Sequence, residues 1–143
     1  MRANTFGFYA INGNSVVDFK KHSKKEDVCA FLESIRDKNQ GKRIIIIMDN
    51  FKSHHAKMTI AKAKALDEVL VFLPPYSPDL NPIEFIWKSI KRVISETFVV
   101  SVEHLKTTIK EAFIRHSRSL SYAEKWINTF LGEEVQKYIS LGT

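Results

Sequence analysis

The stretch "FLPPYSPDLNPIEFIW", from Phe72 to Trp87, contains all four prolines of this 143-residue chain. Proline fixes the backbone torsion φ and removes an amide donor, so the run from Pro74 to Pro82 is neither helix interior nor central strand. The run predicts a short, stiff connection, and Glu84 follows it at once. What this glutamate can do depends on the segments on either side of the connection.

Composition fits one domain with a real core, because 44% of the residues are hydrophobic. The single cysteine, Cys29, excludes an internal disulfide framework and a multi-cysteine zinc site, and its apolar neighbours predict a core position. No apolar run approaches the roughly 20 residues of a membrane-spanning helix, and the start lacks the features of a signal peptide. We therefore expect an intracellular protein.

The formal charge of +6 comes from 22 Lys and Arg against 16 Asp and Glu. This excess fits a polyanionic partner such as nucleic acid, because cationic side chains displace condensed counterions from phosphates. Many basic proteins bind no nucleic acid, so charge alone does not decide the partner.

The first forty residues predict a hairpin and a helix. Residues 4–11 and 15–19 are β-rich and flank an Asn-Gly pair, which is a strong hairpin signal. Residues 23–41 predict a helix with Ser23 as its N-cap and Gly41 at its end. Its core positions keep a spacing of three and four: Val28, Phe31, Leu32 and Ile35.

The middle of the chain predicts two buried strands that alternate with helices. "RIIIIM", residues 43–48, is continuously apolar and β-branched, which is typical of a strand covered on both faces. A helix over 55–66 and a second buried strand over 68–73 follow it. The next helix runs from about Pro82 to Glu96, with Asn81 as a good N-cap and Pro82 in the first turn.

From Val102 onward the chain is expected to be helical, with two apolar stripes. The first consists of Leu105, Ile109, Ala112 and Phe113, and the second of Tyr122, Trp126, Phe130 and Leu131. The whole order (hairpin, helix, strand, helix, strand, helix) predicts an α/β fold with helices packed against a mixed sheet. We expect a single domain over 1–143, with the sheet and one functional helix in about 1–100 and C-terminal helices in 101–143.

Asp49 follows the most buried predicted strand. In open α/β sheets the carboxyl ends of strands are where ligands bind, so a carboxylate there has a rigid backbone and an open side. Alternatively, Asp49 caps the following loop or helix through its side-chain oxygen. Asp49 taken by itself leaves both interpretations open.

Glu84 lies near the start of a helix whose apolar stripe faces the core. It shares another face with Lys88, Lys91 and Arg92. Taken alone, it would be a first-turn acid that the helix dipole favours and that pairs with Lys88. The stiff connection favours a second interpretation, in which the prolines bring Glu84 to face Asp49 across the carboxyl edge of the sheet.

Two carboxylates held close together repel unless a cation joins them, and ligation by oxygen alone suits Mg²⁺ or Mn²⁺. Two such ions about 3.5–4 Å apart can activate water and stabilise the leaving oxygen of a phosphodiester. The sequence thus predicts a divalent-metal site that Asp49 and Glu84 share.

The blocks "IIIIMDNFKSHHAK" and "FLPPYSPDLNPIEFIWKSIKR" resemble the catalytic domain of DDE transposases in the mariner-like superfamily, which includes many insertion-sequence enzymes. The second block matches the family pattern without a break from Leu73 to Glu84, and 34 residues separate Asp49 from Glu84. The resemblance covers about Thr5 to Ile94. It implies an RNase H-like fold and metal-dependent cleavage and joining of DNA at transposon ends.

The resemblance also assigns residues. Asp49 and Glu84 would be the second and third acids of the triad and would bind Mg²⁺ or Mn²⁺. The supporting positions are Asn50, His54, Tyr76 and Asn81. The expected DNA contacts come from Lys52, Lys88, Lys91 and Arg92.

The family's first catalytic Asp lies on a strand before the hairpin, and this chain begins too late to contain that strand. Asp18 is the only early acid on a strand-like run, and we interpret it as a surface strand residue. We therefore expect a transposase fragment that is inactive alone, with weak metal binding. The alternative is a non-catalytic DNA-binding or interaction remnant of a transposase.

The missing strand predicts association with other chains, and the preceding observations predict the remaining partners and the location. A sheet without its first strand exposes an edge, and exposed edges pair with other chains. We expect a homodimer or strand exchange between copies, and an N-terminal transposase portion encoded upstream as a further partner. We expect DNA as substrate, no membrane contact, and a place in the cytoplasm at the prokaryotic nucleoid.

Overall fold

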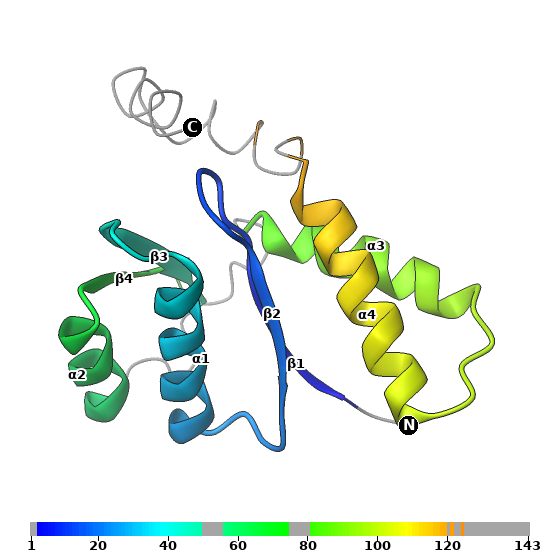
Figure 1. Ribbon diagram of the computed structural model, residues 1–143, viewed down its shortest axis with the longest axis horizontal. Coiled ribbons are helices and arrows are strands. Elements are labelled where there is room, and N and C mark those ends of the chain that lie inside the picture. The colour runs from blue at the N-terminus through cyan, green and yellow to red at the C-terminus, as the bar shows by residue number, and fades with distance from the viewer. Residues whose placement is uncertain (1–2, 50–55, 75–80, 120, 122–123, 125–143) are drawn as a thin grey trace. The chain divides into compact units, whose positions relative to one another are not determined.

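The computed structural model describes residues 3–49, 56–74, 81–119, 121 and 124 (Figure 1). Strands and helices alternate after an initial strand pair, in the order expected of an α/β fold. The elements are β1 (Asn4–Phe8), β2 (Val16–Lys20), α1 (Lys25–Lys38), β3 (Ile44–Met48), α2 (Lys57–Ala65), β4 (Glu68–Phe72), α3 (Ile83–Ser95) and α4 (Val102–Ser117).

The chain forms two compact units. The sheet unit comprises residues 2–6 and 18–81, and the helical unit comprises residue 1 with residues 7–17 and 82–143. Strands β1 and β2 pair with each other, as the hairpin signal predicts. The predicted single domain over 1–143 stays a prediction.

In the sheet unit, β3 and β4 pair in parallel. Ile44 is opposite Glu68 and Met48 is opposite Phe72, so the two strands end at the same edge. The pairing continues one residue further, because the Leu73 amide donates to the Met48 carbonyl at 2.9 Å. In a parallel pair, alternate residues direct their backbone groups to opposite sides. Ile45 and Ile47 therefore point their amides and carbonyls away from β4.

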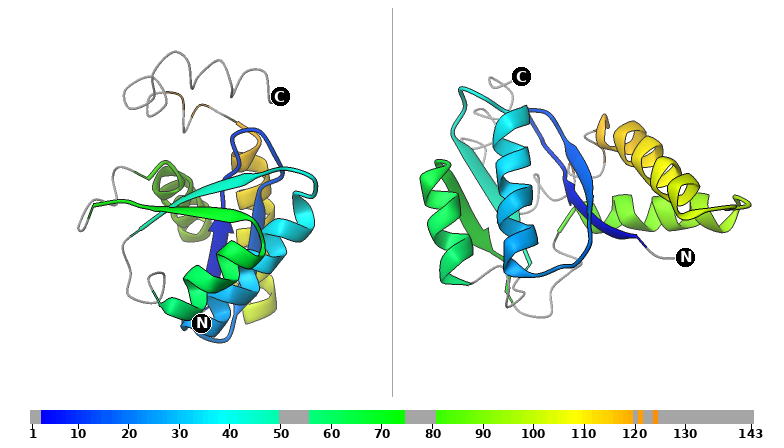
Figure 2. Two further views of the ribbon diagram at one scale, coloured as in Figure 1. Left: turned by 90° about the vertical axis from the view of Figure 1, so that its left-hand side faces the viewer. Right: turned by 60° about the horizontal axis from the view of Figure 1, so that its bottom comes forward.

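Helix α1 contributes the apolar core of the sheet unit. Its buried positions include all four that the spacing predicts, together with Cys29, as expected. The Phe31 ring lies 5.5 Å from the Phe6 ring, which attaches α1 to β1. Helix α2 runs beside α1, where Lys62 pairs with Glu33, and it also contacts β4 (Figures 1 and 2).

The expectation that β3 is covered on both faces is wrong for the described residues. Ile44 and Ile46 are buried, but the Ile45 side chain is 65% exposed. On β4, Val69 and Val71 are exposed on the same face as Ile45. A continuous apolar run cannot distinguish a strand buried on both faces from one buried on a single face, because it has no polar residue to mark an exposed side.

In the helical unit, α3 packs on α4 and on the end of β1. The predicted α4 stripe is buried along its whole length, and the Trp87 and Phe113 rings lie 5.2 Å apart. Gly7 fits against these two rings. A Cβ atom at Gly7 would lie 2.5 Å from Trp87 and 2.9 Å from Phe113, so only a glycine permits this approach.

Two predicted N-caps differ from the structure. Helix α1 is capped at Lys24 rather than Ser23, and the Lys24 amide donates to the Asp27 carboxylate at 3.1 Å. Helix α3 is capped at Pro82 rather than Asn81, without a side-chain cap bond. In α1 the carboxylate of the N3 residue, Asp27, accepts the amide of Lys24, and the helix begins one residue later than the Ser cap predicts.

The predicted second stripe, residues 122 to 131, lies outside the described residues. Within the described part of the chain, no helix has the length and apolar character needed to cross a membrane.

Candidate active site

Asp49 lies at the carboxyl edge of the β3–β4 pair. It follows Met48, whose carbonyl accepts the Leu73 amide, so Asp49 and the start of the proline segment leave the sheet at one place. Its side chain is half-buried. This is the position that the sequence predicts for Asp49, and it is where an open sheet can present a ligand-binding carboxylate.

Glu84 is the second residue of α3 and the acid in its first turn. The free amides of this turn carry partial positive charge, which stabilises a carboxylate. The neighbouring residue Ile83 is half-buried, and Ile86 is fully buried, so Glu84 is held on a firmly packed turn. A metal ligand needs this kind of fixed backbone.

Asp49 belongs to the sheet unit and Glu84 to the helical unit. Their meeting at a shared metal ion stays a prediction. Within residues 3–49, 56–74 and 81–119, no group of three or more His, Cys, Asp or Glu side chains is placed to hold a metal ion.

The supporting residues are only partly described. Asn50, His54 and Tyr76 lie outside the described residues, and so does the predicted DNA contact Lys52. Asn81 is half-buried and precedes the capping Pro82, and its role stays a prediction.

Asp18 lies on β2, as expected of a surface strand residue. Its carboxylate lies 3.0 Å from the Lys20 ammonium and accepts the Phe19 amide at 2.8 Å. These local contacts are sufficient to explain an acid at this position.

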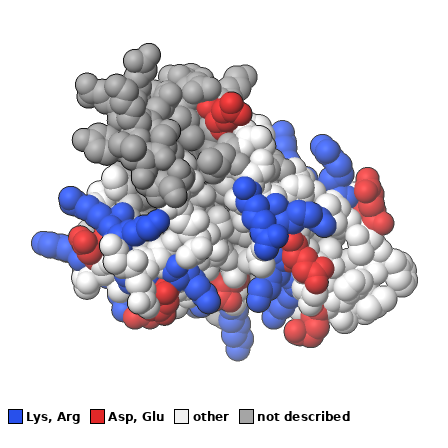
Figure 3. All heavy atoms as spheres, turned by 45° about the horizontal axis from the view of Figure 1, so that its top comes forward, with Lys and Arg blue, Asp and Glu red and all other residues white. Residues whose placement is uncertain are grey.

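The predicted DNA-contacting residues of α3 are exposed. Lys88, Lys91 and Arg92 face solvent, whereas Ile86 and Ile90 face the core. The acids of this segment, Glu84 and Glu96, stand only at the two helix ends. In Figure 3, Lys and Arg side chains are spread over the visible face with acids among them. The stretch of α3 from Lys88 to Arg92 differs, because it carries cations and no acid.

Phe85 is a residue of this surface that the sequence reasoning missed. The residue is 45% exposed, and the Lys88 ammonium lies 5.9 Å from its ring centroid. Helical spacing offers a signal for it, because Phe85 falls three residues before Lys88 and seven before Arg92, on the polar face.

A family model described as the DDE superfamily endonuclease matches residues 1–106. The chain belongs to this superfamily. The match spans Asp49, the proline segment and Glu84, so it covers every position that carries the resemblance. No curated protein matches the sequence.

Among solved structures, the chain is similar to the catalytic domain of the Mos1 mariner transposase. The Mos1 catalytic domain determined with raltegravir and Mn has 18% identity and a TM-score of 0.65, over 87% of this chain and 74% of that one. A second Mos1 catalytic-domain structure has 18% identity and a TM-score of 0.62, over 87% of this chain and 72% of that one. This likeness confirms the predicted RNase H-like α/β fold.

Proposed function

We propose that this chain is the metal- and DNA-binding part of a DDE transposase that cleaves and joins DNA at transposon ends. The observation that carries the proposal is Asp49 at the carboxyl edge of β3, beside the start of the proline segment that leads to Glu84. Such an enzyme of a prokaryotic mobile element would work at the nucleoid.

The donor set fits Mg²⁺ or Mn²⁺, since Asp49 and Glu84 offer only oxygen ligands. When bound, such ions supply an activated water and stabilise the leaving oxygen. The chain's own part is to hold the two carboxylates on a strand end and a first helical turn, and to bind phosphates through Lys88, Lys91 and Arg92.

With two acids of a three-acid site, we propose weak metal binding and little catalysis by this chain alone. Removing one carboxylate takes away charge as well as geometry from a two-metal site. A transposase portion encoded upstream would supply the remaining ligand in trans.

Mn²⁺ binding and Mn²⁺-dependent nicking of supercoiled DNA test this proposal. We expect Asp49→Ala and Glu84→Ala each to weaken Mn²⁺ binding, measured by electron paramagnetic resonance, by at least about tenfold, since even outer partners of metal ligands are worth about 10–100-fold. Residual nicking should fall in parallel. Asp18→Ala is the matched control and should change neither. Wild-type protein that binds no Mn²⁺, or binding that survives both substitutions, would contradict the shared site.

A non-catalytic DNA-binding remnant is the second candidate, because the exposed cations of α3 suit a phosphate backbone with or without a metal. Salt-sensitive, sequence-independent DNA binding without any Mn²⁺-dependent cleavage would favour it.

We also propose that two copies associate through β3. Among the described residues β3 pairs with β4 alone, and Ile45 and Ile47 direct their backbone groups to the open side. An antiparallel pair of β3 strands centred on Ile46 satisfies these groups. This register also places Arg43 of each copy opposite Asp49 of the other, so opposite charges meet at both ends. In this dimer Asp49 pairs with Arg43 of the other copy. Because Asp49 is also the proposed metal ligand, the dimer would be the metal-free state.

Sedimentation analysis tests the β3 pairing. We expect a concentration-dependent dimer that Ile45→Lys converts to a monomer, because an exposed lysine on an edge strand blocks pairing. Val71→Lys is the matched control. It adds the same charge to the same face but on β4, and it should leave the dimer intact. A wild-type monomer at high concentration would rule out this association.

A further inference from the structure

The solvent face of α3 combines one aromatic ring with three cations. Phe85 is 45% exposed, although the core residue beside it, Ile86, is 0% exposed. The ring therefore points away from the packed side of the helix. It shares its face with Lys88 and Arg92, and Lys91 lies next to them.

The contact between Phe85 and Lys88 gives this ring a defined environment. The Lys88 ammonium lies 5.9 Å from the ring centroid, within the range of a cation–π interaction. A cation held beside an exposed ring offers two functions to one ligand, a flat apolar surface and a positive charge. An unpaired nucleotide carries both matching parts, a base with a π-face and a phosphate.

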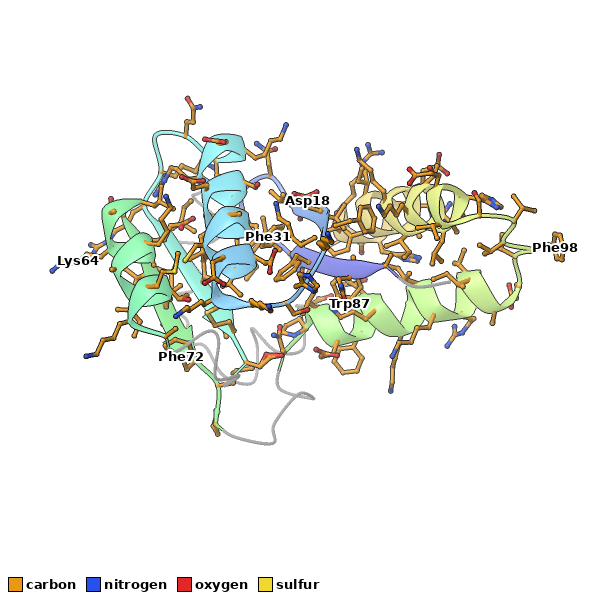
Figure 4. The ribbon with its side chains drawn as sticks, turned by 90° about the horizontal axis from the view of Figure 1, so that it is seen from below. Asp18, Phe31, Lys64, Phe72, Trp87 and Phe98 are labelled. Atoms are coloured by element: carbon orange, nitrogen blue, oxygen red, sulfur yellow. The ribbon has the colours of Figure 1, made fainter. Side chains whose placement is uncertain are left out.

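Phe98 is a second exposed phenylalanine of the helical unit. Phe98 is 86% exposed in the connection between α3 and α4, where its side chain projects away from both helices (Figure 4). Phe85, in contrast, has the Lys88 ammonium placed over its ring. The two phenylalanines thus differ in local charge, which makes Phe98 a matched control.

We propose that Phe85 stacks on an unpaired base of the bound DNA, while Lys88, Lys91 and Arg92 hold the adjoining phosphates. The inference deepens the proposed function and rests on it for DNA as the partner. It adds the form of the substrate: a DNA segment with an unstacked base next to Glu84, as in a single strand or at a frayed duplex end. Charge complementarity selects this ligand over an apolar protein surface, which would have to bury three cations without partners.

The test measures DNA binding without a divalent metal, by fluorescence anisotropy across a salt series. Probes are a single-stranded oligonucleotide, a duplex with a frayed end, and a closed hairpin whose bases are all paired because its strands are joined by non-nucleotide linkers. We expect Phe85→Ala to weaken single-strand binding by about 5–150-fold, the value of one base–aromatic stack, with an unchanged salt slope. Lys88→Ala should instead reduce the slope by about 0.7, the value of one phosphate contact on a single strand.

Two further variants make the result specific. Phe85→Trp should retain single-strand binding because it keeps a stacking surface, and Phe98→Ala should bind like the wild type. A 2-aminopurine base in the oligonucleotide should be quenched by the wild type and not by Phe85→Ala. If wild-type protein quenches this base in the frayed duplex as well, and Phe85→Ala does not, the unpaired base lies at a DNA end. If wild-type protein quenches it only in the single strand, the site binds single-stranded DNA.

Three results would overturn the inference. The first is wild-type protein that binds the closed hairpin as tightly as the single strand. The second is an equal loss of binding in Phe85→Ala and Phe98→Ala, and the third is unchanged single-strand binding by a Phe85→Ala variant with a normal melting temperature. Because no metal is present, these results are independent of Mn²⁺ binding by Asp49 and Glu84. If the metal-binding prediction fails, the test of Phe85 is therefore unaffected. If the Phe85 prediction fails, the metal-binding test is likewise unaffected.

Discussion

Arg36→Met is expected to lower the free energy of unfolding of the sheet unit by about 2–4 kcal/mol, since each hydrogen bond to a charged group contributes about 1.5–3 kcal/mol and part of this is recovered by water. Arg36 lies near the end of α1, and its guanidinium donates to four backbone carbonyls. Two belong to the turn after α1, Asn39 at 3.0 Å and Lys42 at 2.6 Å. The other two belong to the α2–β4 connection, Leu66 at 2.8 Å and Asp67 at 3.0 Å.

These four bonds join two connections that are distant in the chain. Asp67 has a φ of 54°, a left-handed conformation that is unusual for a residue other than glycine. The bond from Arg36 to the Asp67 carbonyl helps to hold this conformation, and with it the start of β4. Methionine keeps the length and apolar stem of arginine but leaves the carbonyls without their donor.

Urea unfolding followed by circular dichroism measures this effect. Lys64→Met is the control, because it removes an exposed cation of the same unit whose side chain projects into solvent (Figure 4). We expect it to change the free energy of unfolding by less than about 0.5 kcal/mol, as is usual for surface sites. Equal midpoints for Arg36→Met and Lys64→Met would show that water replaces the four bonds without loss.

Glu68→Gln is expected to stabilise the sheet unit above pH 7. Glu68 is 4% exposed at the start of β4, and neither carboxylate oxygen has a hydrogen-bond partner among the described residues. Burial raises the pKa of Glu68 from 4.5 to about 7, and the nearby Arg36 charge opposes this shift. The folded state therefore favours the neutral carboxyl group.

The sign of the pH dependence follows from this direction. Below about pH 4.5 Glu68 is protonated in both states and imposes no charge penalty. As pH rises through 4.5 to 7 the unfolded chain loses its proton first, so stability falls. Above pH 7 both states are ionised, and the full penalty of about 3 kcal/mol is present, since one pKa unit corresponds to about 1.4 kcal/mol.

Urea titrations at pH 4.5, 6 and 8 measure this profile. Glu68→Gln should match the wild type at pH 4.5 and exceed it by up to about 3 kcal/mol at pH 8. Asp37→Asn removes an exposed carboxylate of the same unit and should leave the slope unchanged. A wild-type profile that is flat between pH 4.5 and 8 would mean that water or a cation compensates the buried charge.

Several features of the fold were predictable because they depend on neighbouring residues. The apolar stripes of α1 and α4 are visible as a spacing of three and four, and all their members are buried as predicted. The order of elements and the strand end at Asp49 were also predictable. The N-caps at Lys24 and Pro82 were not. In α1 the Lys24 amide finds its acceptor in Asp27, and in α3 no side chain caps the helix, so its first residue is not set by capping propensity.

Other features required distant contacts. No local pattern shows that Arg36 reaches a connection thirty residues away, that Glu68 is buried, or that Ile45 is exposed. For the candidate site, the sequence identifies Asp49 and Glu84 by residue type and surroundings, and their common metal ion stays a prediction. Phe85 was overlooked because the sequence reasoning considered only the charged residues of the polar face of this helix.

The sequence by itself determined the family, the strand and helix order, and the two carboxylates, since motif, periodicity and proline chemistry act over a few residues. The tertiary structure alone decided which face of β3 is covered, which carbonyls Arg36 binds, and how deeply Glu68 is buried. The physical reason is that burial and hydrogen-bond partners depend on elements far apart in the chain, whose packing overrides the preference of any single residue.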